Sequence, residues 1–283
     1  MKRMSIYLEL LLTYVFFLVL AFFYRGPGLQ GNVDKILSIA TFLFAIDLGF
    51  STANRKSRLD SIRSLLRKND GTILEIYEMS KNINKKVNDK IRGLLDELLI
   101  AQIDYKLVDF EKTEPQLIKL VEYIDTIDAK DDPGEYKARL IDKGQELIDT
   151  QKQLVYWLKD KMMLFEWISL LIFAAIMIYC VFAISNGSLL TTIVLPMAGT
   201  AMVLLLYVVR DIDNLSWQEG AWIWNRLIEL FKELDLPPYI LNVLFTQNRI
   251  KKNKLELPNE YRLVEYSHPY PDFSDKKVTL VKN

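Results

Sequence analysis

Four long apolar stretches interrupt the polar parts of the chain, and their spacing sets the predicted architecture. A spanning helix needs about 20 mostly apolar residues to cross a hydrocarbon core of about 30 Å. Four stretches meet this requirement: residues 5–24, 33–50, 164–184 and 189–209. Gly- and Pro-containing turns at 25–32 and a short turn at 185–188 join them in pairs. The pattern therefore predicts four transmembrane helices in two hairpins.

The polar segment between the hairpins, residues 51–163, is predicted to be almost wholly helical. Apolar residues recur at spacings of three and four from Ile73 to Leu98, and again from Leu140 to Leu158, where the helix is expected to continue into the third span. Glu114 and Pro115 can begin a short helix between these stripes. We interpret the stripes as the core of a bundle within one copy; packing between copies is the alternative.

The C-terminal part begins with an amphipathic stretch that would lie in the membrane interface or cap the bundle. Its tryptophans are candidate interface anchors, because an indole ring favours the boundary between lipid and water: Trp217, Trp222 and Trp224. The last segment is polar and suggests an extended tail or a short hairpin. The predicted fold is thus an all-α integral membrane protein with a cytoplasmic helical bundle inserted between spans two and three. Its predicted domains are 1–50, 51–163, 164–209, 210–245 and 246–283.

Lysine and arginine positions predict the orientation. Lys2 and Arg3 precede the first span, and a basic group that includes Arg55, Lys56 and Arg58 follows the second, whereas the short turns carry few bases. We therefore expect a multi-pass protein of the cell inner membrane with both termini in the cytoplasm. The basic group after span two is expected to contact anionic headgroups.

Composition excludes several other classes. The 283 residues have a formal net charge of zero, so no basic field favours a nucleic acid partner. With Cys180 and His268 as the single cysteine and histidine, neither an internal disulfide nor a structural zinc site is expected. Enzyme motifs such as GxSxG, the Walker A loop and GxGxxG are missing from the sequence, so no enzyme and no cofactor are predicted.

Polar residues inside span two are the first candidates for function. On a helix that advances about 100° per residue, one small and hydroxylated face contains Asp34, Ser38, Thr41, Ala45 and Thr52. This face would line a water-filled ion pathway, or it would simply let helices approach closely. Asp47 projects to the other side of the helix. It would attract cations, as an ion-pathway residue, or form a salt bridge or cap near the boundary.

Span four supplies two further candidates. A kink-prone face would act as a gate hinge or as a packing notch, and it contains Pro196, Gly199 and Thr200. Asp211 and Asp213 have a spacing that suggests a cation contact, although the glycine of a calcium loop is missing.

The layout resembles the bestrophin-like membrane proteins of prokaryotes. The matching features are the four-span plan with its helical insert, the exit 45-AIDLGFSTANRKSRLDSI-62 and the segment 211-DIDNLSWQEGAW-222. The resemblance implies an oligomeric channel, since bestrophins are ring-shaped anion channels. The chain has no clear equivalent of the bestrophin neck or calcium clasp, so no site residue is carried over.

These observations together predict a homo-oligomeric ion channel in a lipid bilayer, with span two lining the path of a small inorganic ion. One alternative is a non-conducting scaffold or sensor whose cytoplasmic helices recruit a partner. A second alternative is a membrane-disrupting effector in stress or defence.

Overall fold

The computed structural model describes residues 6–23, 31–105, 107–128, 135–215, 221–246, 250, 255–268 and 270–282. The chain forms two compact units. Unit 1 comprises Met1–Leu59 and Lys161–Ser216, and unit 2 comprises Asp60–Asp160 and Trp217–Asn283. Each unit thus combines segments that lie far apart in the sequence. The predicted turn at 25–32 falls largely outside the described residues.

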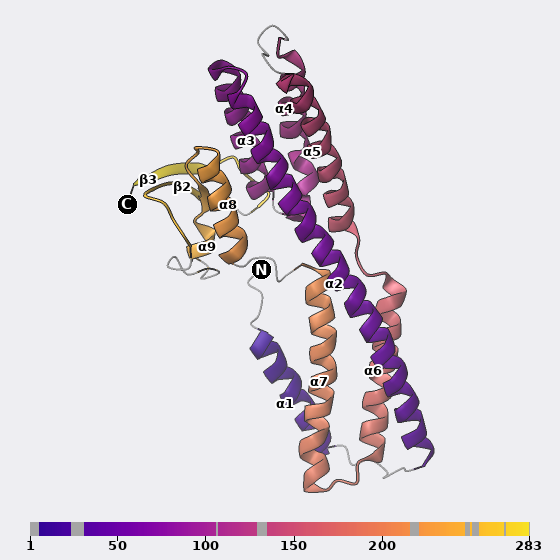
Figure 1. Cartoon of the computed structure of the whole chain (residues 1–283). Helices are drawn as coiled ribbons and strands as arrows, with labels where there is room; N and C mark the ends of the chain where they lie inside the picture. Colours follow the sequence, from indigo (N-terminus) through magenta and orange to yellow (C-terminus); the bar gives the residue numbers. More distant parts are fainter. Residues whose placement is uncertain are drawn as a thin grey trace. The chain divides into compact units, whose positions relative to one another are not determined.

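Unit 1 is made of apolar helices. They are α1 (Ile6–Phe23), the first part of α2 (Asn32–Lys81), α6 (Leu164–Ile184) and α7 (Leu189–Asp213). Helix α1 lies against α7 (Figure 1). Side chains of α2, α6 and α7 form one small core around Phe44, Leu170 and Met202. The turn at 185–188 is confirmed; there Ser188 caps α7 by accepting the N–H of Thr191.

Three stretches contain a helix long and apolar enough to cross a membrane: Asn32–Lys81, Tyr136–Ile184 through its part α6, and Thr191–Asp213. The apolar part of α1 that is described, Leu8–Phe23, is shorter. Unit 1 also exposes many large apolar side chains, among them those of Phe16, Phe23, Phe42, Phe50 and Leu164. Exposed apolar surface of this extent is typical of contact with lipid. Length and composition therefore support three crossings, and the fourth stays a prediction.

Unit 2 contains a helical bundle and a small sheet. Its helices are the rest of α2, α3 (Lys85–Asp104), the 3₁₀ helix η1 (Leu107–Thr113), α4 (Glu114–Thr126), α5 (Tyr136–Lys159), α8 (Ala221–Glu233) and α9 (Val243–Thr246). Every residue of the two predicted apolar stripes is buried within this one chain, including Ile73, Leu98 and Leu147. The interpretation of the stripes as core packing within one copy is confirmed. The predicted helix start at Glu114 is confirmed as well.

The prediction that the second stripe continues into span three is wrong. Helix α5 ends at Lys159 and α6 begins at Leu164. The intervening amides have other acceptors, because Met162 N–H donates to Asp213 Oδ1 at 2.9 Å and Met163 N–H donates to Glu166 Oε2 at 2.8 Å. Residues 160–163 are therefore not helical.

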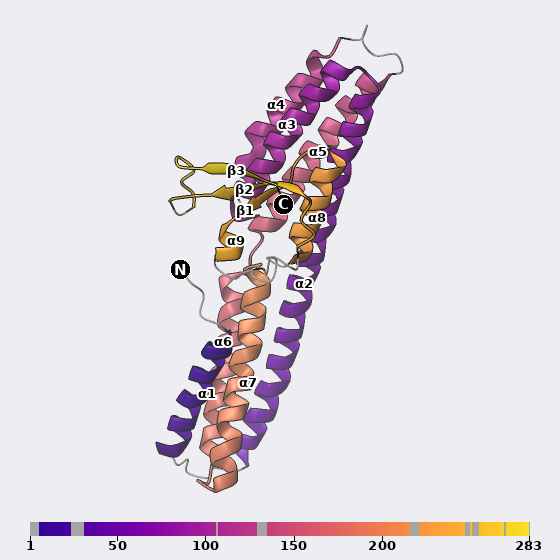
Figure 2. The same ribbon diagram turned by 90° about the vertical axis from the view of Figure 1, so that its left-hand side faces the viewer.

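The all-α prediction missed a three-stranded sheet at the C-terminal end. Its order is β1 (Tyr239–Leu241), β2 (Glu260–Glu265) and β3 (Lys277–Lys282) (Figure 2). Strands β1 and β2 are parallel, whereas β2 and β3 form an antiparallel hairpin. The last segment is therefore a hairpin, one of the two predicted forms. Helix α8 packs on the bundle through Ile228 and Phe231, which favours the capping alternative for this helix.

Side chains with complementary charge attach the sheet to α3. Arg262 of β2 makes two hydrogen bonds to the carboxylate of Asp96, at 2.6 and 2.7 Å. Asp104 accepts hydrogen bonds from Tyr239 at 2.8 Å, from Lys276 at 2.7 Å and from Tyr266. Burial raises the pKa of the Tyr239 and Tyr266 phenols well above the ordinary value for tyrosine, so both stay protonated and act as donors at physiological pH. We call this group of side chains the C-terminal clasp.

Candidate functional site

The predicted hydroxylated face of α2 is uncovered in one copy of the protein. Ser38, Thr41 and Ala45 are exposed, as is Asp34 one turn earlier, while Thr52 is half-buried. The side of α2 that packs in unit 1 is a different one. It lies roughly 100° around the helix from this face, given about 100° per residue, and contains Ala40, Phe44 and Ser51.

The remaining exposed side of α2 is apolar. Ile39, Phe42, Leu43 and Ile46 are all exposed there. The part of α2 in unit 1 thus has three sides. One packs against other helices of the unit, one is suited to lipid, and one is polar and is covered by none of the residues that the structure describes. Ser38 Oγ donates to Asp34 O at 2.9 Å, which reduces the cost of this hydroxyl in an apolar environment.

Asp47 lies on the packed side rather than on the hydroxylated face. Its Oδ2 accepts a hydrogen bond from Ser169 Oγ of α6 at 2.5 Å. A carboxylate among apolar helices needs such a partner. The contact favours a structural role, in which Asp47 holds α2 against α6. Sequence reasoning missed Ser169, because a single serine in an apolar span gives no local signal.

Asp213 at the end of α7 is the centre of a buried polar cluster. Its Oδ1 lies 3.4 Å from Arg55 Nη1 and 3.8 Å from Arg58 Nη1, and accepts the N–H of Met162. Arg58 also donates to the backbone carbonyl of Asp213 at 2.7 Å, and its side chain is only 1 % exposed. The cluster therefore ties α2 and the start of α6 to the end of α7.

This cluster corrects the prediction that Arg55 and Arg58 contact headgroups, because both face Asp213 instead. It also bears on the suggested cation contact. Asp211 pairs with Arg210 at 3.3 Å, and Arg210 also pairs with Glu9 of α1 at 3.1 Å. The carboxylates of Asp211 and Asp213 thus both face guanidinium groups. Among the residues that the structure describes, there is no group of three metal-ligating side chains.

Gly199 in α7 forms a notch for α1. A Cβ built on Gly199 would lie 2.9 to 3.0 Å from three ring atoms of Phe17, so any side chain here would require the ring to shift. Thr200 Oγ1 donates to Pro196 O at 2.6 Å, one turn back on the same helix. The close approach of the Phe17 ring accounts for the glycine without a hinge, so the geometry favours the packing alternative.

The predicted tryptophan anchors are only partly described. Trp217 and the side chain of Trp222 lie outside the described residues. Trp224 is half-buried against the core of unit 2, so protein packing accounts for its position.

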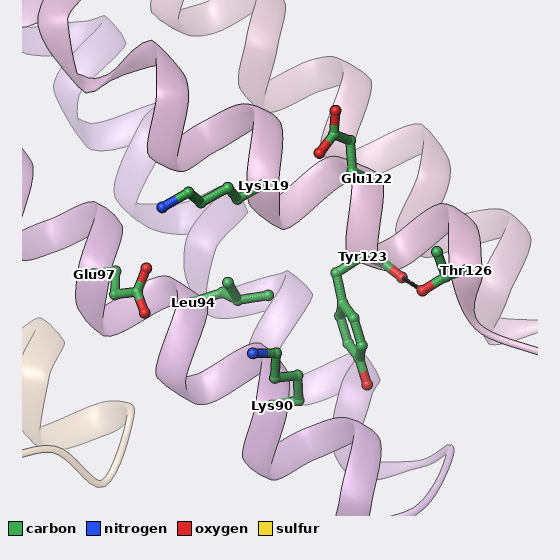
Figure 3. Close-up of a pocket in the computed structure, with 7 residues that line it drawn as sticks. All are labelled: Lys90, Leu94, Glu97, Lys119, Glu122, Tyr123 and Thr126. Carbon is green, nitrogen blue, oxygen red and sulfur yellow. Dashed lines mark hydrogen bonds between the residues drawn. The ribbon is translucent and has the colours of Figure 1, made fainter.

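A shallow hollow of about 390 Å³ lies on unit 2 between α3 and α4 (Figure 3). Its charged lining is balanced: Lys90 and Glu97 come from α3, and Lys119 and Glu122 come from α4. Burial raises the pKa of Tyr123 at its edge, which keeps the phenol neutral. Lysines and glutamates that alternate in this way form a solvated helical surface and give no preference for an anion or a cation.

No family model, curated protein or solved structure matches the chain. The resemblance to bestrophin-like proteins therefore stays a prediction from sequence. What the structure brings together is the Asp213 cluster, the Asp47–Ser169 contact and the Phe17–Gly199 notch. What it leaves uncovered is the hydroxylated face of α2.

Proposed function

We propose that the protein is a homo-oligomeric membrane protein whose copies surround a path for a small inorganic ion, lined by the hydroxylated face of α2. The observation that carries the proposal is the exposure of Ser38, Thr41 and Ala45 on a helix whose other exposed side is apolar. Hydroxyl and carboxyl groups within a span usually face a bundle interior, a partner helix or water. The described residues of one copy leave this face exposed, so the path requires several copies.

The orientation and the fourth crossing belong to the same proposal. In it α1 crosses the membrane with α2, α6 and α7, and both termini and unit 2 lie in the cytoplasm. The excess of lysine and arginine near the ends of the predicted spans supports this arrangement. The proposal assigns no catalytic reaction to the chain. The resemblance to bestrophin-like proteins is consistent with a ring of copies.

Bulky substitutions on two exposed sides of α2 test the proposal. Thr41→Trp would place an indole in the path, whereas Ile39→Trp places the same side chain on the apolar side. We expect ion flux into liposomes, measured per reconstituted copy, to fall strongly for Thr41→Trp and to stay near the wild-type value for Ile39→Trp. Particle size in detergent must be equal for all three proteins, so that a change in flux reflects the path.

Three results would contradict the proposal. Equal flux for the two tryptophan variants would show that the hydroxylated face does not line the path. A monomeric particle would remove the space that the path requires. Absence of flux for any small ion, with oligomers intact, would favour a non-conducting scaffold.

The scaffold is the second candidate function, and one observation favours it. Unit 2 has its own core and a charged outer surface on α3 and α4, as partner recruitment would require. A scaffold would retain its oligomers and its partner binding in the Thr41→Trp variant. Flux measurements therefore separate the two functions.

A further inference from the structure

Strand β3 presents an unpaired outer edge. It is the last strand of the sheet, and each of its residues except Val281 is exposed, whereas all three residues of the opposite edge strand β1 are buried. Figure 2 shows β3 on the outside of the sheet. Among the described residues, no backbone hydrogen bond reaches this outer edge. An exposed edge of this kind is a template for pairing with another strand.

Hydrogen bonds between β1 and β2 reveal which backbone groups of β2 face β3. Arg262 N–H donates to Pro238 O at 2.7 Å, and Val264 O accepts from Asn242 N–H at 2.8 Å. In a strand the N–H and C=O of one residue point to the same edge, and neighbouring residues point to opposite edges. The groups of Arg262 and Val264 therefore face β1, and those of Leu263 face β3.

The register of the hairpin then assigns the outer edge of β3. Leu263 is opposite Thr279, so the backbone groups of Thr279 are bonded to β2. The N–H and C=O groups of Val278, Leu280 and Lys282 consequently point outward. The side chains of Val278 and Leu280 are themselves 50 % and 48 % exposed. The outer edge thus combines free backbone groups with apolar side chains on one face.

We propose that β3 pairs with β3 of a second copy of this chain, antiparallel about a two-fold axis at Leu280. In this register Leu280 is opposite Leu280 of the second copy, and Val278 is opposite Lys282 of the second copy. All outward-pointing residues then meet outward-pointing residues, as an antiparallel ladder requires. The sheet becomes continuous across the two copies. The pairing concerns unit 2 alone and does not depend on conduction, but its strength rests on the membrane anchoring in the proposed function.

The position of Lys282 selects this register over the one centred at Thr279. An axis at Thr279 would also join outward-pointing residues, but it would set Lys282 opposite Lys276 of the second copy, which precedes β3 and whose ammonium group donates to Asp104 in the C-terminal clasp. With the axis at Leu280, the aliphatic part of Lys282 covers Val278. The ammonium group of Lys282 lies 3.6 Å from Glu260 of its own copy, which provides a counter-charge at the same place.

The β3–β3 contact is small, so its strength depends on whether the two copies are anchored near each other. One pair of short strands is marginal in water. Copies anchored in the same membrane meet at a raised effective concentration, which strengthens a weak contact without new interactions. We therefore expect the pairing in the membrane or in intact oligomers rather than between dilute copies.

Cysteine cross-linking of the full-length protein in membranes tests the register. Leu280→Cys places two thiols directly opposite each other, at a Cα separation of about 5.5 Å that suits a disulfide. Native Cys180 is buried and does not compete. We expect mild oxidation to give a dimer for Leu280→Cys, and little dimer for Lys282→Cys, because Lys282 meets Val278. The double variant Val278→Cys, Lys282→Cys should cross-link again.

A proline substitution tests the same pairing without a disulfide. Val278→Pro removes an outward N–H and leaves the bonds to β2 intact, so the hairpin should persist. Introduced into Leu280→Cys, it should lower the yield of dimer several-fold. Equal cross-linking of every single cysteine, no cross-linking of Leu280→Cys, or cross-linking of Leu280→Cys to a different protein would each overturn the proposal.

Discussion

Replacement of Asp213 by asparagine distinguishes a structural anion from a cation-binding residue. Asparagine has nearly the same shape as aspartate and keeps an oxygen acceptor for Met162 N–H, but it lacks the negative charge. The variant therefore removes only the attraction to Arg55 and Arg58. Their side chains are 11 % and 1 % exposed, and that of Asp213 is 6 % exposed, so water contributes little screening.

The expected loss of stability follows from this burial. Removal of one partner from a buried ion pair costs about 3 to 5 kcal/mol. We expect about 3 kcal/mol, the lower end of that range, because Arg58 keeps its hydrogen bond to the backbone carbonyl of Asp213. At about 2 to 4 °C per kcal/mol, the melting temperature should fall by roughly 6 to 12 °C.

Thermal unfolding of the detergent-solubilised protein measures this change. Asp211→Asn is the matched control, because its partner Arg210 is 35 % exposed and also pairs with Glu9, so the loss of stability should be smaller than for Asp213→Asn. Two results would refute the reasoning. One is an Asp213→Asn variant as stable as the wild type. The other is a wild-type melting temperature that rises with an added cation, with that rise absent from Asp213→Asn, as a cation site would produce.

Three further predictions address other parts of the fold. Gly199→Ala should destabilise the protein by about 1 to 3 kcal/mol through overpacking, and Phe17→Leu should restore part of that loss in thermal unfolding if Gly199 is a notch. The hydrogen bond from Tyr270 lowers the pKa of Asp109 below its ordinary 3.8. The contribution of Asp109 to stability should therefore be complete above pH 3.8 and disappear as the pH falls through the lowered pKa. Asp109→Asn should flatten this acid dependence in melting curves recorded at a series of pH values. Asp104→Asn should weaken the C-terminal clasp by about 1.5 to 3 kcal/mol and speed protease cleavage in the C-terminal hairpin, and unchanged cleavage would contradict the role of the clasp.

Periodicity was sufficient to predict most of the helical core. Ile73, Leu98 and Leu147 belong to apolar stripes with spacings of three and four residues. Because an α-helix repeats every 3.6 residues, such side chains share one helix face, and that face is buried. The β2–β3 hairpin was only one of two alternatives, because its strands are short and a long loop joins them.

The candidate site was predictable only where a helix face defines it. The small face with Ser38 and Thr41 is visible in the sequence because its residues repeat with the helical turn. The contact of Asp213 with Arg58 joins residues 155 positions apart, and the contact of Ser169 with Asp47 joins residues 122 positions apart. Such pairs leave no local pattern, since their partners are chosen by tertiary packing.

The long separation between Arg58 and Asp213 has a consequence for biogenesis. Insertion machinery reads lysine and arginine in a chain that is still being made, when Asp213 has not yet been synthesised. In the proposed topology, Arg55 and Arg58 would then carry unneutralised charge and retain the end of α2 on the side of synthesis. Once α7 emerges, the same two arginines become its docking point. In that topology, the order of translation would let one pair of residues set the orientation first and the contact with Asp213 afterwards.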